Sequence, residues 1–401
     1  MIETEMICTY LINALKKAGY KESTVFYYQG VVRRFLSFCK AHDVKEYTPD
    51  FGSKYANDFI SKMTGKFSHE RFQTQGRFIR LLDSYYNTGN FSFATQKRKW
   101  VPPDNPVHRY IFVGYQKHLR QNYSNEQTIY YYEYELYAFL QHLNSAGIDD
   151  MDLITPKTVF HYIQNTNNSS RQRSLLCGVK SFFRYLNRND LLEAIAGIHA
   201  IRTKKIIPTL TNAENKKLEE VLNSEKTSLR NKAIILLGLS SGIRACDLIN
   251  LKLADVDWAT ETISFCQSKT GNFVCLPLIP SVGNALFRYL SEERPKTNND
   301  YIFVRKLAPF DPLSSHSACY AITKKIFNKA GIKKNNRIFG MNFLRHNAAS
   351  VMVRNEVPIE TIAAILGHSS PDSTAIYITT DERKLVECVL PLKNISTEVH
   401  S

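Results

Sequence analysis

Apolar residues recur at helical spacing through most of the chain, and this pattern predicts a mainly helical protein. Two runs, 77–82 and 179–186, are basic and aromatic, with apolar residues on one face of each expected helix. Residues 233–239 are continuously apolar, which predicts a buried helix ending near Gly242. Helical spacing returns at Val282 and predicts helices to the end of the chain.

One segment departs from the helical pattern. Residues 262–269 and 272–277 read as two strands on either side of Thr270 and Gly271, a typical hairpin turn pair. This places Lys269 at the tip of the hairpin, from where it could swing toward a ligand. The expected fold is therefore mainly α with a small β-hairpin or sheet.

The first half of the chain contains a repeated pattern. Residues 24–28 and 128–132 each consist of a threonine followed by apolar and aromatic residues, at an offset of 104. Phe35 and Phe139 follow at the same offset. We expect two small helical bundles of similar design that arose by duplication. The alternative is a coincidence between amphipathic helices.

Two basic segments divide the chain. Residues 96–106 are basic and then proline-rich, which predicts an extended linker, and residues 201–208 are basic as well. The second segment leads to Thr211 and Glu214, which form a capping-box signature at the start of a helix. We expect three domains: a helical module at 1–96, a second module at 107–200, and a mixed α+β domain at 207–401.

Composition narrows the class of partner. The net charge of +15 and a pI of about 9.3 favour a polyanion, either nucleic acid or an acidic membrane. The acidic start does not resemble a signal peptide, and the longest apolar run is too short to span a bilayer. The eight cysteines are scattered without a C-x-x-C pair, so we expect reduced thiols, no zinc site and a cytoplasmic location.

Five residues follow one another in an order with chemical meaning: Arg244, Lys269, Arg345, His368 and Tyr377. A tyrosine that attacks a phosphodiester in line adds negative charge to the non-bridging oxygens, and two guanidinium groups could clamp them. A mobile lysine could protonate the departing 5′-oxygen, and a histidine could bind the phosphate or take the tyrosine proton. This chemistry requires no metal or other cofactor, and no carboxylate cluster suggests one.

The motifs that carry these residues resemble those of the tyrosine recombinase (phage integrase) family, including its Xer-like members. Gly-Ile-Arg-Ala-Cys-Asp at 242–247, Ser-Lys-Thr-Gly at 268–271 and Leu-Gly-His at 366–368 with the later tyrosine match the family pattern. The resemblance implies that Arg244 and Arg345 clamp the scissile phosphate and that Lys269 is the general acid. It further implies that His368 assists and that Tyr377 forms a 3′-phosphotyrosine, with Asp247 supporting the first arginine.

One position departs from the family. The box that usually reads H-x-x-R-H begins here with Asn342, and an amide can bind a phosphate oxygen but cannot relay a proton. We therefore expect retained phosphate binding with weaker proton transfer. The last residue of the box, His346, is expected to be structural, because adjacent helical residues such as Arg345 and His346 point apart.

The resemblance implies a site-specific recombinase, the integrase of a phage or mobile element, that cuts and rejoins double-stranded DNA without ATP or metal. A SAM-like core-binding module (107–200) and the catalytic domain (207–401) would clamp the duplex in a C shape, and the first module would bind a further DNA site or extend the clamp. The free monomer or weak oligomer would form a homotetramer on DNA, through a Holliday junction. It would lie in the cytoplasm with the nucleoid, with no membrane partner and with room for an accessory DNA-bending protein. The apolar stripe at 385–390 resembles a helix donated to a neighbouring subunit.

Two alternatives remain at this stage. A type IB topoisomerase uses the same five groups to relax DNA without specific sites, although two helical modules favour a recombinase. A DNA-binding protein that has lost catalysis is the second, with Asn342 as the first sign of decay. The presence of Tyr377, Lys269 and both arginines argues against that loss.

Overall fold

The computed structural model describes most of the chain and divides it into two compact units. It describes residues 2–61, 63–93, 102–165, 169–199, 208–313, 316–335, 337, 339–368, 374 and 377. Residues 95–205 form one unit, and residues 1–94 and 206–401 form the other. Within the described residues the protein is mainly helical with one small antiparallel sheet, which confirms the predicted fold class.

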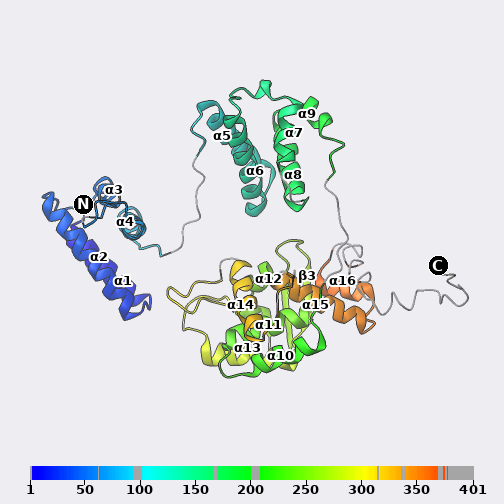
Figure 1. Cartoon of the computed structure of the whole chain (residues 1–401). Coiled ribbons are helices and arrows are strands. Elements are labelled where there is room, and N and C mark those ends of the chain that lie inside the picture. Colours follow the sequence, from blue (N-terminus) through cyan, green and yellow to red (C-terminus); the bar gives the residue numbers. More distant parts are fainter. Residues whose placement is uncertain are drawn as a thin grey trace, which may run out of the picture. The chain divides into compact units, whose positions relative to one another are not determined.

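The first module is a bundle of four helices around an aromatic core (Figure 1). Phe35 is fully buried, and its ring contacts those of Tyr55 and Phe78. Thr48 and Ser68 accept backbone N–H bonds and so begin the third and fourth helices. The helices are α1 (Thr4–Lys17), α2 (Glu22–Ala41), α3 (Pro49–Ala56) and α4 (His69–Thr88).

The second module has the same order of helices and its own hydrophobic core (Figure 1). Asn105, Asn125 and Thr155 cap its first three helices. Its elements are α5 (Pro106–Asn122), α6 (Glu126–Ser145), a short 3-10 turn (Met151–Leu153), α7 (Pro156–Gln164), α8 (Ser169–Tyr185) and α9 (Asn189–Ala194).

The cores of the two modules share several ring contacts. Helices α2 and α6 are both 20 residues long and are offset by 104 residues. Three ring pairs of the first module recur at equivalent positions: Phe35–Tyr55, Phe35–Phe78 and Phe38–Tyr55 correspond to Phe139–Tyr162, Phe139–Phe182 and His142–Tyr162. This correspondence supports the prediction that the modules arose by duplication.

The third part of the chain packs helices around the buried helix α11 (Figure 1). α11 contacts α13 and α15, and α16 lies against β3. The predicted capping box at Thr211 is present at the start of α10. The elements are α10 (Asn212–Asn223), α11 (Leu229–Ser241), α12 (Ala245–Asn250), a 3-10 turn (Leu253–Asp255), β1 (Val256–Asp257), β2 (Thr262–Cys266), β3 (Phe273–Pro277), α13 (Pro280–Arg288) with a π turn (Tyr289–Glu293), α14 (His316–Lys329), α15 (Met341–Arg354) and α16 (Ile359–Leu366).

The sheet has three strands in the order β1-β2-β3, all antiparallel. The hairpin prediction is confirmed, but the strands are shorter than predicted because residues 267–272 form the turn between them. The sequence analysis did not identify the two-residue strand β1, which is too short to show alternation.

The prediction of helices from Val282 onward is wrong for residues 294–313. Three prolines in this stretch each remove a backbone donor that a helix needs. The guanidinium of Arg294 instead donates to the carbonyls of Asn299, Tyr301 and Ile302, which stabilises a non-helical turn. The predicted stripe at 385–390 and both basic linkers, apart from a few residues at their ends, lie outside the described residues.

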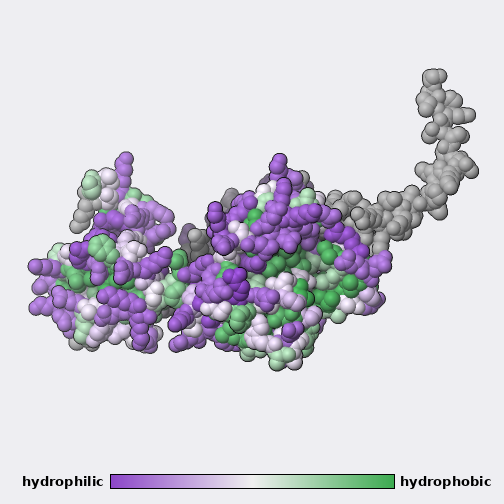
Figure 2. All heavy atoms as spheres, turned by 90° about the horizontal axis from the view of Figure 1, so that it is seen from below, coloured by the Kyte–Doolittle hydropathy of each residue, from purple (hydrophilic) through white to green (hydrophobic). Residues whose placement is uncertain are grey.

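The surface is largely polar. Figure 2 shows hydrophilic residues over most of the face in view, broken by hydrophobic areas. In the described residues no helix combines the length and apolar character that a membrane crossing requires. The seven described cysteines are all free thiols.

Candidate active site

A pocket of about 710 Å³ in the third part of the chain collects nearly all of the predicted site residues. Its walls come from segments far apart in the sequence, namely α12, the β2–β3 turn, α14, α15 and the stretch after α16. The predicted residues that line it are Arg244, Lys269, Asn342, Arg345, His368 and Tyr377. Asp247 is buried and does not line the pocket.

Arg345 lies at the bottom of this pocket, with 6% of its surface exposed. Its Nη1 donates to the Gly242 carbonyl at 2.8 Å, and its Nη2 donates to the Leu366 carbonyl at 2.8 Å. These carbonyls end α11 and α16, where the helix dipoles present negative charge. Burial, helped by the nearby charge of Arg244, lowers the pKa of Arg345 to about 10, so the group stays charged at neutral pH.

Arg244 precedes α12 and is held by groups around the pocket. It donates to the Gln267 side chain and, at 3.3 Å, to the Gly367 carbonyl. The Asp247 carboxylate is 3.9 Å from its Nη1 and accepts the backbone N–H of Ser268 at 2.7 Å. Asp247 thus connects α12 to the hairpin, a position that suits the supporting role implied by the resemblance.

Gln267 is a site residue that the sequence analysis missed. This buried amide donates to the Leu366 carbonyl at 3.0 Å and accepts from Arg244 and from Thr270. A Cβ at Gly367 would come within 2.2 Å of the Gln267 side chain, and Gly367 has a φ of 61°. Glycine is therefore required in the Leu-Gly-His motif, but no sequence pattern singled out its partner at position 267.

Lys269 is exposed in the β2–β3 turn and lines the pocket, as predicted. His368 directly follows Gly367, and its Nδ1 lies 2.7 Å from the Thr374 hydroxyl. Burial and the charges of Arg345 and Arg244 lower the pKa of His368 to about 4. A neutral ring of this kind can hydrogen-bond a phosphate at pH 7, but it is not a cationic proton donor.

Tyr377 is 3% exposed, and its hydroxyl lies 3.0 Å from Nδ1 of His346. Burial raises the pKa of Tyr377, while the charge of Arg345 and its hydrogen bond lower it. Burial and then the charge of Arg345 lower the pKa of His346, so its imidazole is neutral at pH 7. A neutral imidazole next to a phenol can accept the phenol proton.

The contact with Tyr377 differs from the structural role expected for His346. Adjacent helical residues do diverge, by about 100°. Both side chains nevertheless line the same pocket. Arg345 extends to its bottom, while His346 contacts Tyr377 at its side. His346 is also one helical turn after Asn342, on the same face of α15. The spacing of Asn342 and His346 could have indicated this role from the sequence, because it places a histidine near the position where the family histidine is missing.

The described residues contain no group of three or more His, Cys, Asp or Glu side chains that could hold a metal ion. The pocket instead concentrates positive charge from two arginines and a lysine around a tyrosine hydroxyl. Chemically, it is suited to bind a phosphodiester and to attack it.

Comparison with known proteins identifies the family. The sequence model of the phage integrase family matches residues 208–384. The integrase/recombinase y4gC of Sinorhizobium fredii is 35% identical over 170 residues, which cover 42% of this chain and 86% of that protein. The chain belongs to the phage integrase family. It also spans 56% of the length of a longer relative from the same organism, y4rF.

Other relatives of this phage integrase family member extend the match. Tyrosine recombinase XerC of Oceanobacillus iheyensis is 28% identical over 302 residues, covering 71% of this chain and 96% of XerC. The fold matches that of a lambda integrase tetramer bound to a Holliday junction, with a TM-score of 0.53, 17% identity, and coverage of 79% of this chain and 90% of the integrase. The family match and the XerC relative place the chain among the tyrosine recombinases and favour neither the topoisomerase nor the impaired alternative.

Proposed function

We propose that this site-specific recombinase cuts and rejoins double-stranded DNA through a 3′-phosphotyrosyl link at Tyr377. The observation that carries the proposal is the position of the Tyr377 hydroxyl, 3.0 Å from a histidine nitrogen in a pocket that holds both arginines. Nucleophile, base and charge stabilisation are thereby in one place, which is what in-line transfer to a tyrosine needs.

The arginines stabilise the charge that develops on the phosphate. A guanidinium carries five N–H groups, and the two helix-end carbonyls take only two of those on Arg345. The remaining donors of Arg345, together with Arg244, can meet the non-bridging oxygens. Neither group needs to move far during the reaction because both are already fixed by protein contacts, and such preorganisation is the main source of electrostatic catalysis.

The protons follow a balanced path. As the Tyr377 oxygen bonds to phosphorus, its proton passes to His346 Nδ1, and Lys269 protonates the departing 5′-oxygen. In rejoining, Lys269 takes the proton of the attacking 5′-hydroxyl, and His346 returns its proton to Tyr377. His346 thus acts as the general base, a role that the amide of Asn342 cannot fill. Asn342 and the neutral His368 hydrogen-bond the phosphate.

The test of the function begins with a duplex selected from a random library by the wild-type protein. A nick beside the scissile phosphate traps the covalent product, and denaturing electrophoresis followed by peptide mass spectrometry locates it. We expect the adduct on Tyr377. An adduct on another residue, or none on the selected duplex, would refute the proposal.

The role of His346 is tested with His346→Asn and with a 5′-bridging phosphorothiolate in the same duplex. A general base typically contributes about 10²–10⁴-fold to the rate, so cleavage should slow by that order. A thiolate leaving group needs no protonation, so the sulfur substrate should rescue Lys269→Ala but not His346→Asn. Rescue of both variants would place His346 on the leaving-group side.

A second variant separates proton transfer from packing of the ring. Asn342→His combined with His346→Asn moves the imidazole back by one helical turn, to the usual family position. We expect partial recovery of cleavage relative to His346→Asn alone, with duplex affinity unchanged in all variants. If cleavage did not recover, and both His346→Asn and the double variant lost thermal stability, His346 would have a structural role.

The assembly proposal rests on the fold and the charge. The lambda integrase structure with this fold is a tetramer on a Holliday junction, and this chain carries a net charge of +15. We infer a homotetrameric synapse on two DNA sites, in which residues 107–200 and 207–401 clamp the duplex and residues 1–96 contact further DNA. The protein would act as the integrase of a phage or mobile element, in the cytoplasm with the nucleoid, with an accessory DNA-bending protein as a further partner. Mass photometry with one and two selected duplexes tests the stoichiometry.

A further inference from the structure

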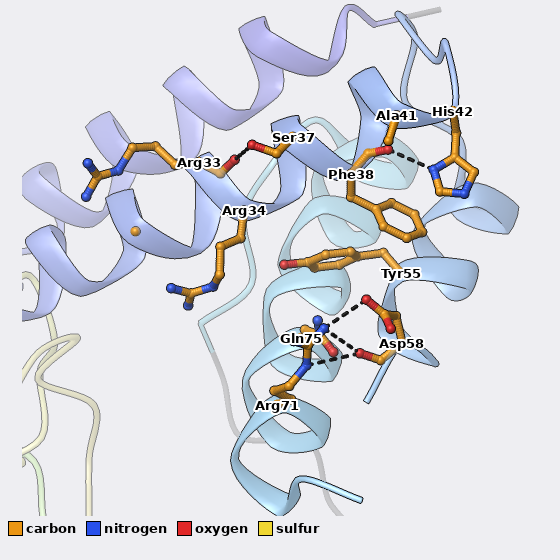
Figure 3. Close-up of a pocket in the computed structure, with 11 residues that line it drawn as sticks. Arg33, Arg34, Ser37, Phe38, Ala41, His42, Tyr55, Asp58, Arg71 and Gln75 are labelled. Atoms are coloured by element: carbon orange, nitrogen blue, oxygen red, sulfur yellow. Dashed lines mark hydrogen bonds and ion pairs between the residues drawn. The ribbon is translucent and has the colours of Figure 1, made fainter. Parts of the chain in front are cut away.

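A second pocket, of about 740 Å³, lies within the first helical module and has no part in the active site described above. It opens between α2, α3 and α4, and Figure 3 shows the side chains around it. Arg34 on α2, Tyr55 on α3, and Arg71 and Gln75 on α4 contribute its polar groups.

The charge in this pocket is only partly neutralised. Arg71 pairs with Asp58, with 2.8 Å between Nη2 and Oδ2, and also donates to the Asp58 carbonyl. Arg34 forms no ion pair with a carboxylate among the described residues. In Figure 3 the Arg34 side chain and the Tyr55 hydroxyl point into the same space, whereas the Arg33 side chain, which also lines the pocket, points away from Tyr55. The pocket therefore keeps a free positive charge beside a hydroxyl donor.

Two deeply buried polar atoms face this space without an adequate partner. Tyr55 is 2% exposed and Gln75 is 5% exposed, and neither the Tyr55 hydroxyl nor Gln75 Oε1 has a hydrogen bond of normal geometry. Burial raises the pKa of Tyr55, while weak hydrogen bonds with Gln75 and Arg34 and the charges of Arg34 and Arg71 lower it, so the hydroxyl is close to these groups but not well paired by them. A buried hydroxyl without a good partner is costly, so a ligand oxygen that accepts from the Tyr55 hydroxyl would recover that cost. Gln75 Oε1 is itself an acceptor, so Gln75 can contribute to a phosphate only through its Nε2 group.

The second module carries apolar residues at most of the equivalent positions. At the offset of 104 residues, Arg34, Arg71 and Gln75 correspond to Ala138, Leu175 and Val179. Leu175 and Val179 are buried in the core of the second module. The Tyr55 counterpart, Tyr162, lies at an offset of 107 because the second module has three more residues before this helix, and it keeps the ring contact with the central phenylalanine. These polar side chains are thus specific to the first module and are not required by the bundle fold.

We propose that this pocket binds a phosphate group through Arg34, the Tyr55 hydroxyl and the Gln75 amide. A guanidinium and neutral donors that converge on one space suit a tetrahedral oxyanion. The volume leaves room for the sugar attached to such a phosphate. The phosphate could come from the backbone of a duplex, a source that rests on the proposed function, or from a free phosphorylated compound, a source that does not.

The experiment uses the full-length protein with three variants. Arg34→Gln and Tyr55→Phe each remove one donor from the pocket. Arg33→Gln is the charge-matched control, because it removes the same charge from the neighbouring residue of α2, which lines the pocket but points away from Tyr55. Affinity for a short selected duplex is measured over a range of salt concentrations, and thermal stability is measured with and without inorganic pyrophosphate. Adduct formation by the wild type is measured on the same preparation.

If the source is the DNA backbone, Arg34→Gln should reduce the slope of log affinity against log salt concentration by about 1. This reduction should exceed any change seen in Arg33→Gln. Tyr55→Phe should weaken duplex binding by about 10-fold, while the free protein keeps or gains thermal stability because its hydroxyl lacked a partner. If the source is a free compound, pyrophosphate should raise the Tm of the wild type and of Arg33→Gln but not of the two pocket variants, with duplex binding unchanged.

The proposal is overturned if Arg34→Gln and Tyr55→Phe behave as Arg33→Gln does in both arms. Failure of the proposed function would look different. A wild type that binds pyrophosphate through Arg34 but forms no adduct would keep the phosphate pocket and reject recombination.

Discussion

The active-site pocket has two regions that differ in how they are held. The arginine floor (Arg244, Arg345 and Gln267) is buried or half-buried and bonded to helix-end carbonyls or to other floor groups. The proton rim (Lys269, His346 and His368) lies on a turn, a helix face and a segment end, with fewer contacts. The arginine floor determines where the negative charge of the transition state is stabilised. In the proton rim, the residue that accepts or donates a proton can differ between related proteins. A substitution that affects only proton transfer, such as Asn342 in place of the family histidine, is therefore tolerated. A substitution of an arginine in the floor would not be.

The largest expected effect is at Tyr377, which both regions serve. Tyr377→Phe removes the attacking oxygen and the contact with His346 but keeps the ring packing. We expect loss of the covalent adduct below detection, with duplex affinity little changed. Gel shift and adduct assays on the selected duplex measure both. A persistent adduct would show that another residue is the nucleophile.

Loss of a floor residue should affect catalysis and stability together. Arg345→Ala removes a transition-state donor, which costs about 3–4 kcal/mol. It also removes the Arg345 bond to the Gly242 carbonyl, at about 1–3 kcal/mol, while the Leu366 carbonyl keeps only its bond from Gln267. We expect slower cleavage and a lower Tm, measured by adduct kinetics and calorimetry. If Arg345→Ala lost activity with an unchanged Tm, the structural half of the floor assignment would be wrong.

Loss of a rim residue should affect catalysis alone. Lys269 is exposed in its turn, so Lys269→Ala should leave the Tm unchanged. Cleavage should slow by about 10²–10⁴-fold, as expected for loss of a general acid. The neighbouring Ser268→Ala, whose backbone N–H bond to Asp247 remains, serves as the control. A large drop in Tm for Lys269→Ala would remove the distinction between rim and floor.

The smallest effect should come from restoring the family histidine. Asn342→His adds an imidazole to an exposed position one turn before His346. We expect equal or somewhat faster cleavage, because proton transfer is already supplied by His346. A new pH dependence near about 6–7 should appear, below which the added ring is protonated and cannot accept a proton. A large loss of activity would mean that the site has been rebuilt around the amide.

The sequence predicted the parts of the site that local geometry enforces. The Arg244 motif, the hairpin lysine and the Leu-Gly-His segment each have their glycine at a turn or a helix end, so each motif determines its own shape. The contacts of Gln267 and His346 were not predicted, because they depend on which segments meet in three dimensions. The non-helical stretch at 294–313 was missed because its apolar residues face the core without a helical repeat.

The position of Arg345 between two helix ends has an evolutionary consequence. Its side chain joins the ends of α11 and α16, so a mutation there removes a fold contact as well as a catalytic group. A lineage that drifts toward a silent DNA-binding protein can lose Lys269, or the Tyr377 hydroxyl by exchange for phenylalanine, at little structural cost, but it cannot easily lose Arg345. In inactive descendants of such a recombinase the arginine should therefore outlast the tyrosine, and its presence alone should not be taken as a sign of activity.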